Sequence, residues 1–294
     1  MENKFIINFT LGETPLHRLT GTTKVRFFLC MIFFLIALWD IRVIMPLLVL
    51  FAAGVVSTRP YWKPLRIIFI IVVLMNLFNL FLYYMFDPEV GKQWTGSFTQ
   101  FGVISGRFVL GYETFWYFGV RFFKLITSFM LCMVFVLSIT PSEFAAGLAS
   151  LRLPYRFCII VELAFRYIPD LLRDYKEISI SAQARGNEAD KRKISLAKRV
   201  KAALMVIIPL ILSSFGRVGD IANAMDLRGF GKMKQRSWYA ERPPAKADRV
   251  VQLIGLLFFI GGVYITLMRL FNPDNPQIWY PYNDLITYNW RIFG

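Results

Sequence analysis

Residues 67–86 form an apolar run that contains no charged side chain. A helix needs about 20 such residues to cross the hydrocarbon core of a bilayer. Lipid cannot hydrogen-bond to the backbone, so a segment that crosses it must pair its own peptide groups, as a helix does. Composition agrees, since 18% of the residues are charged, against about a quarter in soluble domains. We therefore predict an all-α integral membrane protein.

Four further apolar segments predict additional membrane helices, which gives about five crossings. They are residues 27–38, 43–56, 117–139 and 250–270. The first two are short for a full crossing and are separated by Trp39, Asp40 and Arg42. This spacing predicts a tight helical hairpin, and one bent helix is the alternative.

A few polar and small residues in these segments predict contacts between helices. Asn76 and Asn79 lie about one turn apart and are expected to hydrogen-bond to a neighbouring helix. Arg121 and Lys124, near the start of their span, are expected to snorkel to the membrane interface. The last span is predicted to pack closely on another helix through Gly255, Gly261 and Gly262.

The distribution of basic residues predicts the orientation of the chain. The formal net charge is +15, and the basic segments are the N-terminus, residues 59–66 and residues 141–249. Because basic loops stay in the cytoplasm, the N-terminus is predicted to be cytoplasmic and the C-terminus extracellular. Three regions follow: membrane helices in 1–140, a cytoplasmic module in 141–249, and a last helix with an extracellular tail in 250–294. No nucleic-acid-binding motif accompanies the charge.

The sequence offers little for a metal or a cofactor. It has one histidine and three cysteines, without a Cys-x-x-Cys pair, whereas a zinc site takes three or four ligands. Cys30, Cys132 and Cys158 lie in apolar neighbourhoods and are expected to be buried, inert thiols. The stretch Gly229 to Lys232 lacks the spacing of a phosphate-binding loop. We therefore expect no catalytic residue, no metal and no bound ATP.

The basic segment begins with a predicted amphipathic helix over residues 157–182. Its apolar side chains are spaced alternately by four and three positions, which makes one helical stripe. The stripe starts with Phe157, Val161, Ala164, Ile168 and Leu171. Pro169 is expected to kink or break the helix. The helix is predicted to end at Ala184, Arg185 and Gly186, because glycine suits the left-handed turn that stops a helix.

A second amphipathic helix follows and ends in the same way. Its stripe includes Leu204, Ile207, Ile211 and Phe215. Pro209 lies inside it, and it ends at Leu227, Arg228 and Gly229. The apolar run 202–215 is short, which favours a buried or interfacial helix over a membrane crossing. One Arg-Gly helix end is ordinary, since the helix dipole favours a cation in the last turn. Two matched Arg-Gly ends on consecutive helices are unusual, and they indicate a shared role.

These two helix ends resemble the transmembrane T component of energy-coupling factor (ECF) transporters. In that family two Ala-Arg-Gly signatures each close a cytoplasmic coupling helix. The matching sequences here are SAQARG at 181–186 and AMDLRGF at 224–230, with an Arg-x-x-Pro-Asp step from Arg166 to Asp170. The resemblance covers residues 141–231. Leu227 stands where the family has alanine, and because leucine is a good helix former, only the packing against a partner should differ.

The resemblance implies a non-catalytic scaffold in the membrane of a bacterium. Such a subunit joins two cytosolic ATPases, which bind the ATP, to a small membrane S component that binds a vitamin or another micronutrient. The residues that it implies for ATPase docking are Ala184, Arg185, Gly186, Leu227, Arg228 and Gly229. A guanidinium there can dock in an acidic groove through two parallel hydrogen bonds. The residues expected to pack on the S component are Phe157, Val161, Ala164, Ile168, Leu171, Leu204, Ile207, Ile211 and Phe215.

Three other classes of protein are compatible with a basic, apolar chain. An ion-coupled transporter is disfavoured because residues 67–86, 125–139 and 251–268 contain no ionisable Asp, Glu, His, Lys or Arg. A membrane-embedded enzyme is disfavoured because the acids near Asp170 and Asp174 alternate with basic residues, as on a solvated helix face. A membrane protein with a lipid-binding basic face remains an alternative, although it has no need of matched Arg-Gly ends.

Overall fold

The structure is a computed structural model that describes residues 14–58, 60–95, 100–105, 108–185, 196–231, 243–271 and 278. The chain divides into two compact units. Unit 1 consists of Met1–Glu143 and Arg242–Gly294, and unit 2 is Phe144–Glu241. The border falls in the first turn of helix α7 (Pro141–Ser150). The predicted division by membrane topology, at residues 140 and 249, stays a prediction.

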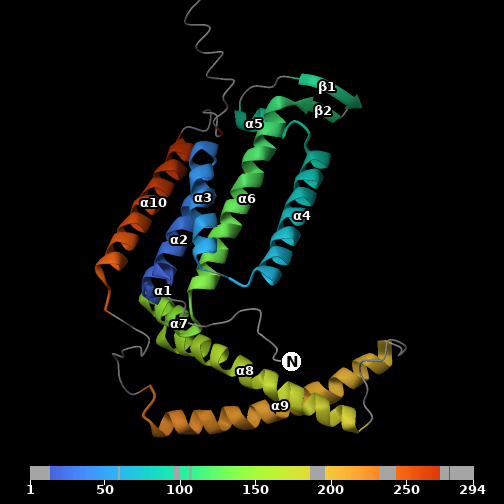
Figure 1. Ribbon diagram of the computed structural model, residues 1–294, viewed down its shortest axis with the longest axis vertical. Coiled ribbons are helices and arrows are strands. Elements are labelled where there is room, and N and C mark those ends of the chain that lie inside the picture. The colour runs from blue at the N-terminus through green and yellow to red at the C-terminus, as the bar shows by residue number, and fades with distance from the viewer. Residues whose placement is uncertain are drawn as a thin grey trace, which may run out of the picture. The chain divides into compact units, whose positions relative to one another are not determined.

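Five long helices form the body of unit 1 (Figure 1). They are α2 (Gly21–Ala37), α3 (Ile41–Ser57), α4 (Trp62–Phe86), α6 (Tyr112–Ser138) and α10 (Lys246–Phe271). Each of the five apolar segments predicted from the sequence corresponds to one of these helices, and the all-α membrane fold is confirmed. By length and composition, the described part of the chain has four helices able to cross a membrane: α4, α6, α10 and Val200–Leu227. The last of these lies in unit 2, so the interfacial placement of residues 202–215 stays a prediction.

Helices α2 and α3 form the predicted hairpin rather than one bent helix. The chain leaves the helical conformation at 38–40, and the Asp40 side chain accepts a hydrogen bond from the Arg42 backbone N–H at 2.9 Å. This contact caps the start of α3. Each helix has 17 residues, which gives a length of about 25 Å, short of the roughly 30 Å hydrocarbon core.

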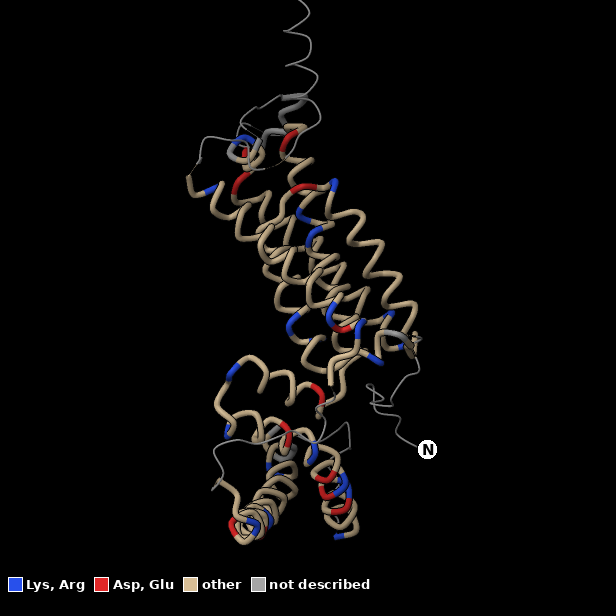
Figure 2. The backbone as a smooth tube through the Cα atoms, turned by 90° about the vertical axis from the view of Figure 1, so that its left-hand side faces the viewer, with Lys and Arg blue, Asp and Glu red and all other residues tan. Residues whose placement is uncertain are grey.

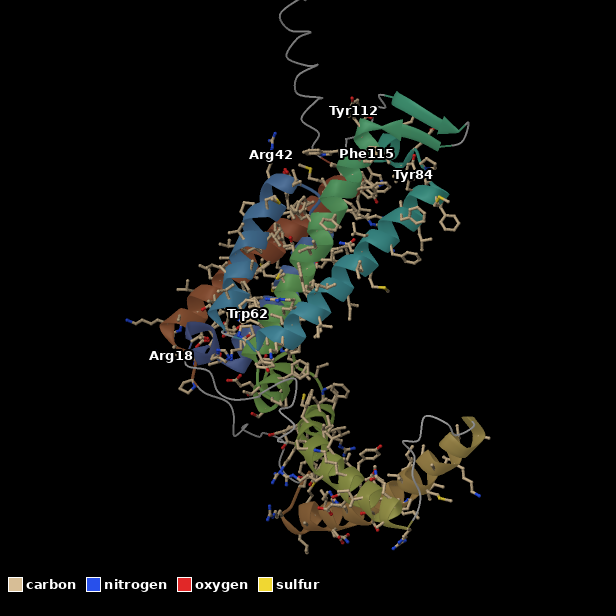
Figure 3. All side chains as sticks on the ribbon, turned by 45° about the vertical axis from the view of Figure 1, so that its right-hand side comes forward. Arg18, Arg42, Trp62, Tyr84, Tyr112 and Phe115 are labelled. Atoms are coloured by element: carbon tan, nitrogen blue, oxygen red, sulfur yellow. The ribbon has the colours of Figure 1, made fainter. Side chains whose placement is uncertain are left out.

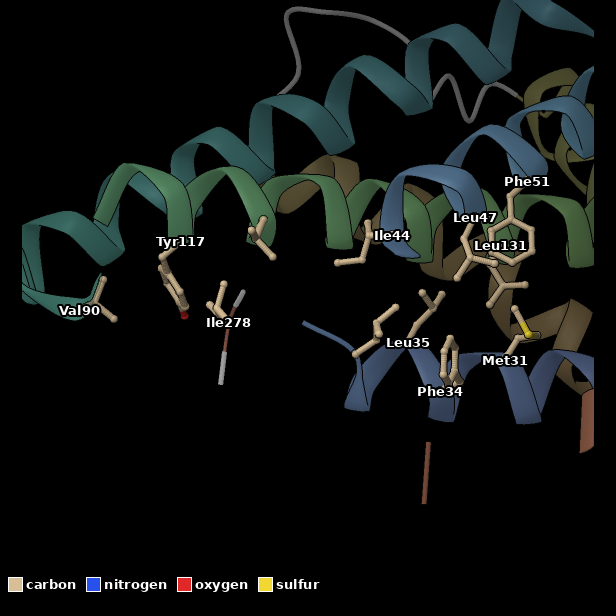
Figure 4. Close-up of a cluster of buried hydrophobic side chains, with 12 residues drawn as sticks. Met31, Phe34, Leu35, Ile44, Leu47, Phe51, Val90, Tyr117, Leu131 and Ile278 are labelled. Carbon is tan, nitrogen blue, oxygen red and sulfur yellow. The ribbon is translucent and has the colours of Figure 1, made fainter. Parts of the chain in front are cut away.

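The buried core of unit 1 lies among α2, α3 and α6. Figure 4 shows Met31 and Leu35 of α2 facing Leu47 of α3 and Leu131 of α6. These side chains are almost fully buried. By contrast, Asn76 is the one buried residue among the described side chains of α4, so the apolar surface of α4 is left to lipid or to another subunit.

Aromatic and charged residues mark the two ends of unit 1. Figure 3 shows Arg42, Tyr84 and Tyr112 at one end and Arg18 and Trp62 at the other. In Figure 2 most charged positions of unit 1 also lie toward these ends, whereas those of unit 2 are distributed along its helices. Aromatic rings and cations at both ends of an apolar band are typical of a protein that spans a bilayer.

Helix α10 packs along α2 through two of the three glycines named above. A Cβ on Gly262 would lie 3.1 Å from Phe34 Cα and 3.2 Å from the Phe33 ring. A Cβ on Gly255 would lie 3.3 Å from the Phe27 ring, whereas one on Gly261 would meet the Phe34 ring at an ordinary 3.6 Å. Close packing is therefore confirmed, and it depends on one face of α10.

Adjacent glycines in α10 make a matched pair for testing this contact. We expect Gly262→Ala to lower the thermal midpoint of the purified protein, because the added methyl group meets the backbone of α2. Gly261→Ala should leave it unchanged or raise it, since alanine is the better helix former by up to about 1 kcal/mol. Thermal unfolding of both variants in one detergent tests this, and equal midpoints would contradict it.

Polar side chains on α4 and α6 join helices to one another. The Asn76 side-chain amide donates to Phe122 O at 3.3 Å, and Arg121 donates to Asn79 Oδ1 at 3.3 Å, so the expected helix–helix role of both amides is confirmed. Lys124 Nζ donates to Ile36 O at 2.8 Å, at the C-terminal end of α2, where the helix dipole favours a cation. The snorkelling suggested for Arg121 and Lys124 stays a prediction, and in the structure both side chains bind neighbouring helices.

The loop between α4 and α6 contains structure that the sequence prediction omitted. A short helix, α5 (Val90–Thr95), precedes an antiparallel hairpin of β1 (Gln100–Ser105) and β2 (Phe108–Gly111). The overlooked signal is Ser105-Gly106, a turn pair between two runs rich in Phe, Val and Ile. The hairpin is a local addition to a helical fold.

Candidate functional site: the crossed helices of unit 2

Two long helices, α8 (Tyr155–Ala184) and α9 (Leu196–Leu227), form most of unit 2 and cross each other (Figure 1). Both run without interruption through their internal prolines, Pro169 and Pro209. Of the kink or break expected at Pro169, the break is therefore wrong, and the kink stays a prediction. A proline removes one backbone donor, and the hydrogen bonds on either side of it keep the long helix continuous.

The C-terminal end of α9 has the geometry that the Arg-Gly pattern predicts. Gly229 has φ +71°, in the left-handed region that favours glycine. Its N–H donates to Asp226 O at 2.9 Å, and the Phe230 N–H donates to Met225 O at 3.0 Å. These two bonds are a Schellman motif, in which the last carbonyls of the helix find partners. The motif leaves Leu227 and Arg228 exposed, with Leu227 at 90%.

The C-terminal end of α8 presents the first arginine. The Arg185 N–H donates to Ser181 O at 3.3 Å and to Ala182 O at 3.2 Å, which closes the last turn. Ala184 and Arg185 are exposed, and Gly186 lies outside the described residues. Arg185 and Arg228 therefore stand at the ends of two different helices, each open to a partner.

An apolar groove with a volume of about 590 Å³ lies between α8 and α9. From α8 it is lined by Arg156, Ile159, Ile160, Leu163, Ala164, Tyr167 and Leu171. From α9 and the turn after it, the lining is Ser214, Arg217, Val218, Ile221, Ala222, Met225 and Phe230. Phe230 also contacts Tyr155, with ring centroids 5.9 Å apart. Phe230, which the Schellman turn positions, thus lines one side of the groove.

The predicted packing stripe divides between this groove and the outer surface. Ala164 and Leu171 line the groove, and Val161 is partly buried. The other six members are exposed: Phe157, Ile168, Leu204, Ile207, Ile211 and Phe215. An exposed apolar surface on this scale indicates a partner or lipid. Sequence reasoning missed Tyr167 and Phe230, because a helical stripe does not reveal which neighbouring helix it faces.

One ion pair joins the two crossed helices. Arg217 of α9 donates to Asp174 of α8, and both side chains are partly buried. Asp174 was expected to belong to a solvated charged face, and that expectation is wrong for this residue. Its neighbour Asp170 does fit it, since it lies 3.7 Å from the exposed Arg173 one turn away.

The structure gives the cysteines different environments. Cys158 is fully buried in α8, and burial raises the pKa of its thiol, which keeps it protonated. Cys30 is partly buried, whereas Cys132 is exposed, so the expectation of a buried thiol is wrong there. No group of three or more His, Cys, Asp or Glu that could hold a metal ion occurs in the parts of the chain that the structure describes.

Comparison with known proteins extends the match well beyond the two helix ends. The model of a family described as cobalt transport protein (CbiQ) matches residues 12–238. The chain belongs to this family. Three relatives bear the name energy-coupling factor transporter transmembrane protein EcfT. The one from Bacillus selenitireducens is 25% identical over 85% of this chain and 96% of its own length. Those from Leuconostoc gelidum subsp. gasicomitatum and Bacillus subtilis are 27% and 29% identical over 88% of this chain and 97% and 99% of their own lengths.

Membership of the EcfT family agrees with the four apolar helices of the structure. The chain is a membrane protein and a transmembrane component of an ECF transporter. The family match covers the membrane helices from α2 to α6 as well as the crossed helices α8 and α9. The sequence resemblance rested on residues 141–231 alone.

Proposed function

We propose that this chain is the scaffold and coupling subunit of an ATP-driven importer for vitamins or other micronutrients. It links two cytosolic ATPase subunits to a small membrane S component. The observation that supports this best is the pair of exposed arginines at the ends of two crossed helices. ATP and the catalytic residues belong to the ATPases, and this chain holds no cofactor.

Each arginine is suited to one of two related ATPase subunits. Arg185 and Arg228 are exposed, and neither end is covered by another described part of unit 2. A guanidinium is always charged, and its planar fork matches a carboxylate in two parallel hydrogen bonds. The partner surface is therefore expected to be an acidic groove that accepts the end of a helix.

The apolar groove and the exposed stripe provide the surface for the S component. Residues such as Ile160 and Val218 line the groove with apolar atoms, and Phe215 is 70% exposed on the outer surface of α9. A membrane subunit with an apolar surface can cover them. The proposed orientation has a cytoplasmic N-terminus, which brings the basic residues of unit 2 to the ATPases.

Co-purification from the native host tests the proposal. We expect the tagged wild type, extracted in mild detergent, to recover two ATPase subunits and a small membrane protein. Arg185→Glu with Arg228→Glu should lose the ATPases, since reversing a charge at such an interface costs about 2 kcal/mol or more per site. Lys176→Glu with Lys201→Glu is the matched control, because it makes the same charge change at exposed positions of α8 and α9.

Each outcome has a definite meaning. Capture of ATPases by the wild type and by the lysine control, but not by the arginine variant, supports docking at the helix ends. Wild type without ATPases contradicts the scaffold function. Equal capture by all three keeps the partners and rejects the arginines as the essential contacts. Arg185→Lys with Arg228→Lys separates docking from attraction to anionic lipid, because lysine preserves the charge and loses the fork.

A further inference from the structure

The chain passes between the two units twice, and the first passage starts with a capping box. Thr140 and Glu143 are the N-cap and third residues of α7. The Thr140 N–H donates to Glu143 Oε2 at 3.1 Å, and the Glu143 N–H donates to Thr140 Oγ1 at 3.3 Å. This reciprocal pair fixes the direction in which α7 begins.

The second passage returns at α10, which begins with one half of this arrangement. The Ala245 N–H, just before α10, donates to Asp248 Oδ2 at 2.9 Å. Asp248 is the third residue of the helix and is 1% exposed. Both helices at the border of unit 1 therefore begin with a carboxylate that folds back on the preceding backbone.

Each of these carboxylates also binds the beginning of α2. The Thr20 N–H and hydroxyl donate to Asp248 Oδ1 at 2.9 and 3.1 Å. Lys24 Nζ lies 2.9 Å from Glu143 Oε2 in an ion pair whose side chains are 4% and 13% exposed. Thr20 and Lys24 are one turn apart, so one short segment contacts the starts of both helices.

Further short contacts join this segment to α6 and α10. Lys24 Nζ donates to Ser138 O at 2.8 Å, in the last turn of α6, and Gln252 of α10 donates to Thr23 Oγ1 at 2.8 Å. A Cβ on Gly21 would lie 2.2 Å from Glu143 O. The first turn of α2 is therefore in contact with the ends of α6, α7 and α10 together.

We propose that Thr20–Lys24 is a single anchor that holds the starts of α7 and α10, the two helices at the border of unit 1. Because the starts of both helices bind one turn of α2, they cannot shift independently of each other. If the proposed function holds, this constraint transmits a movement of the crossed helices to α2 and α10. The anchor itself concerns this chain alone.

Hydrogen exchange on the purified full chain in nanodiscs tests the anchor without any partner. Lys24→Met removes the ammonium that binds Glu143, and Asp248→Asn weakens the contact with Thr20. Exchange is followed in residues 136–148 and 243–254. Arg18→Met is the matched control, because Arg18 is an exposed cation two residues before the anchor (Figure 3). A shared anchor predicts that each variant speeds exchange in both regions by about tenfold or more, as a 1.4 kcal/mol loss of protection would.

The effect on the distant passage decides the test. Lys24→Met removes hydrogen bonds to Ser138 and Glu143, which lie in the first region, so faster exchange at residues 243–254, with Arg18→Met unchanged, supports one anchor. Faster exchange only in the passage that each variant touches would overturn the proposal and leave two separate helix caps. Capture of ATPases by these variants is a separate measurement, so a failure of the proposed function is distinguishable from a failure of the anchor.

Discussion

Replacing Gly21 by alanine is expected to destabilise unit 1 strongly. The new Cβ would lie 2.2 Å from Glu143 O and 2.7 Å from Glu143 C, so it overlaps backbone rather than a movable side chain. Either α2 or the start of α7 must shift. We expect a loss of about 3 kcal/mol in the free energy of unfolding, at the upper end for overpacked sites. Thermal unfolding in detergent and the yield of monodisperse protein measure it.

Gly119→Ala is the control for this variant. Gly119 lies inside α6, and a Cβ there would have no neighbour within 4 Å. Alanine is the better helix former, so this variant should be as stable as the wild type or more so. If Gly21→Ala proved as stable as Gly119→Ala, the close contact between α2 and α7 would be wrong.

The second large effect is expected from Arg217→Ala, which removes the ion pair between the crossed helices. Asp174 would keep its charge beside an apolar groove without its partner. Because the pair is only partly buried, we expect a cost of about 1–2 kcal/mol, between surface and buried pairs. The crossing of α8 and α9 should then become more variable.

Spin labels at two exposed positions, Lys176 on α8 and Asp220 on α9, measure this variability after replacement of the native cysteines. We expect a narrow distribution of distances with the pair intact and a broader one in Arg217→Ala. Exchanging the two residues, as Asp174→Arg with Arg217→Asp, should restore much of the narrow distribution. A distribution unaffected by Arg217→Ala would show that the apolar groove alone holds the crossing.

The sequence was sufficient for the features that depend on near neighbours along the chain. The apolar run 67–86 predicted a membrane helix, which α4 confirms. The Arg-Gly pattern at 228–229 predicted a helix end with a left-handed glycine, which the φ of Gly229 confirms. Two local features were overlooked although their signals were present: the capping box that starts at Thr140 and the turn pair at Ser105-Gly106.

Contacts between distant residues could not be predicted from a single sequence. Lys24 and Glu143 are 119 positions apart, and nothing in the pattern around either residue indicates the other. The same holds for Asp174 and Arg217, which look like members of ordinary charged helix faces. Which faces of α8 and α9 form the groove likewise depends on how the two helices cross.

The sequence by itself determined the class of this protein, its long helices and the Arg-Gly end of α9. The reason is that lipid solvation, helical periodicity and capping act over a few residues. Tertiary structure alone decided which of these helices meet: the core among α2, α3 and α6, the groove of unit 2, and the turn of α2 that binds the starts of α7 and α10. Those contacts depend on the packing of segments far apart in the chain, and only the folded molecule brings them together.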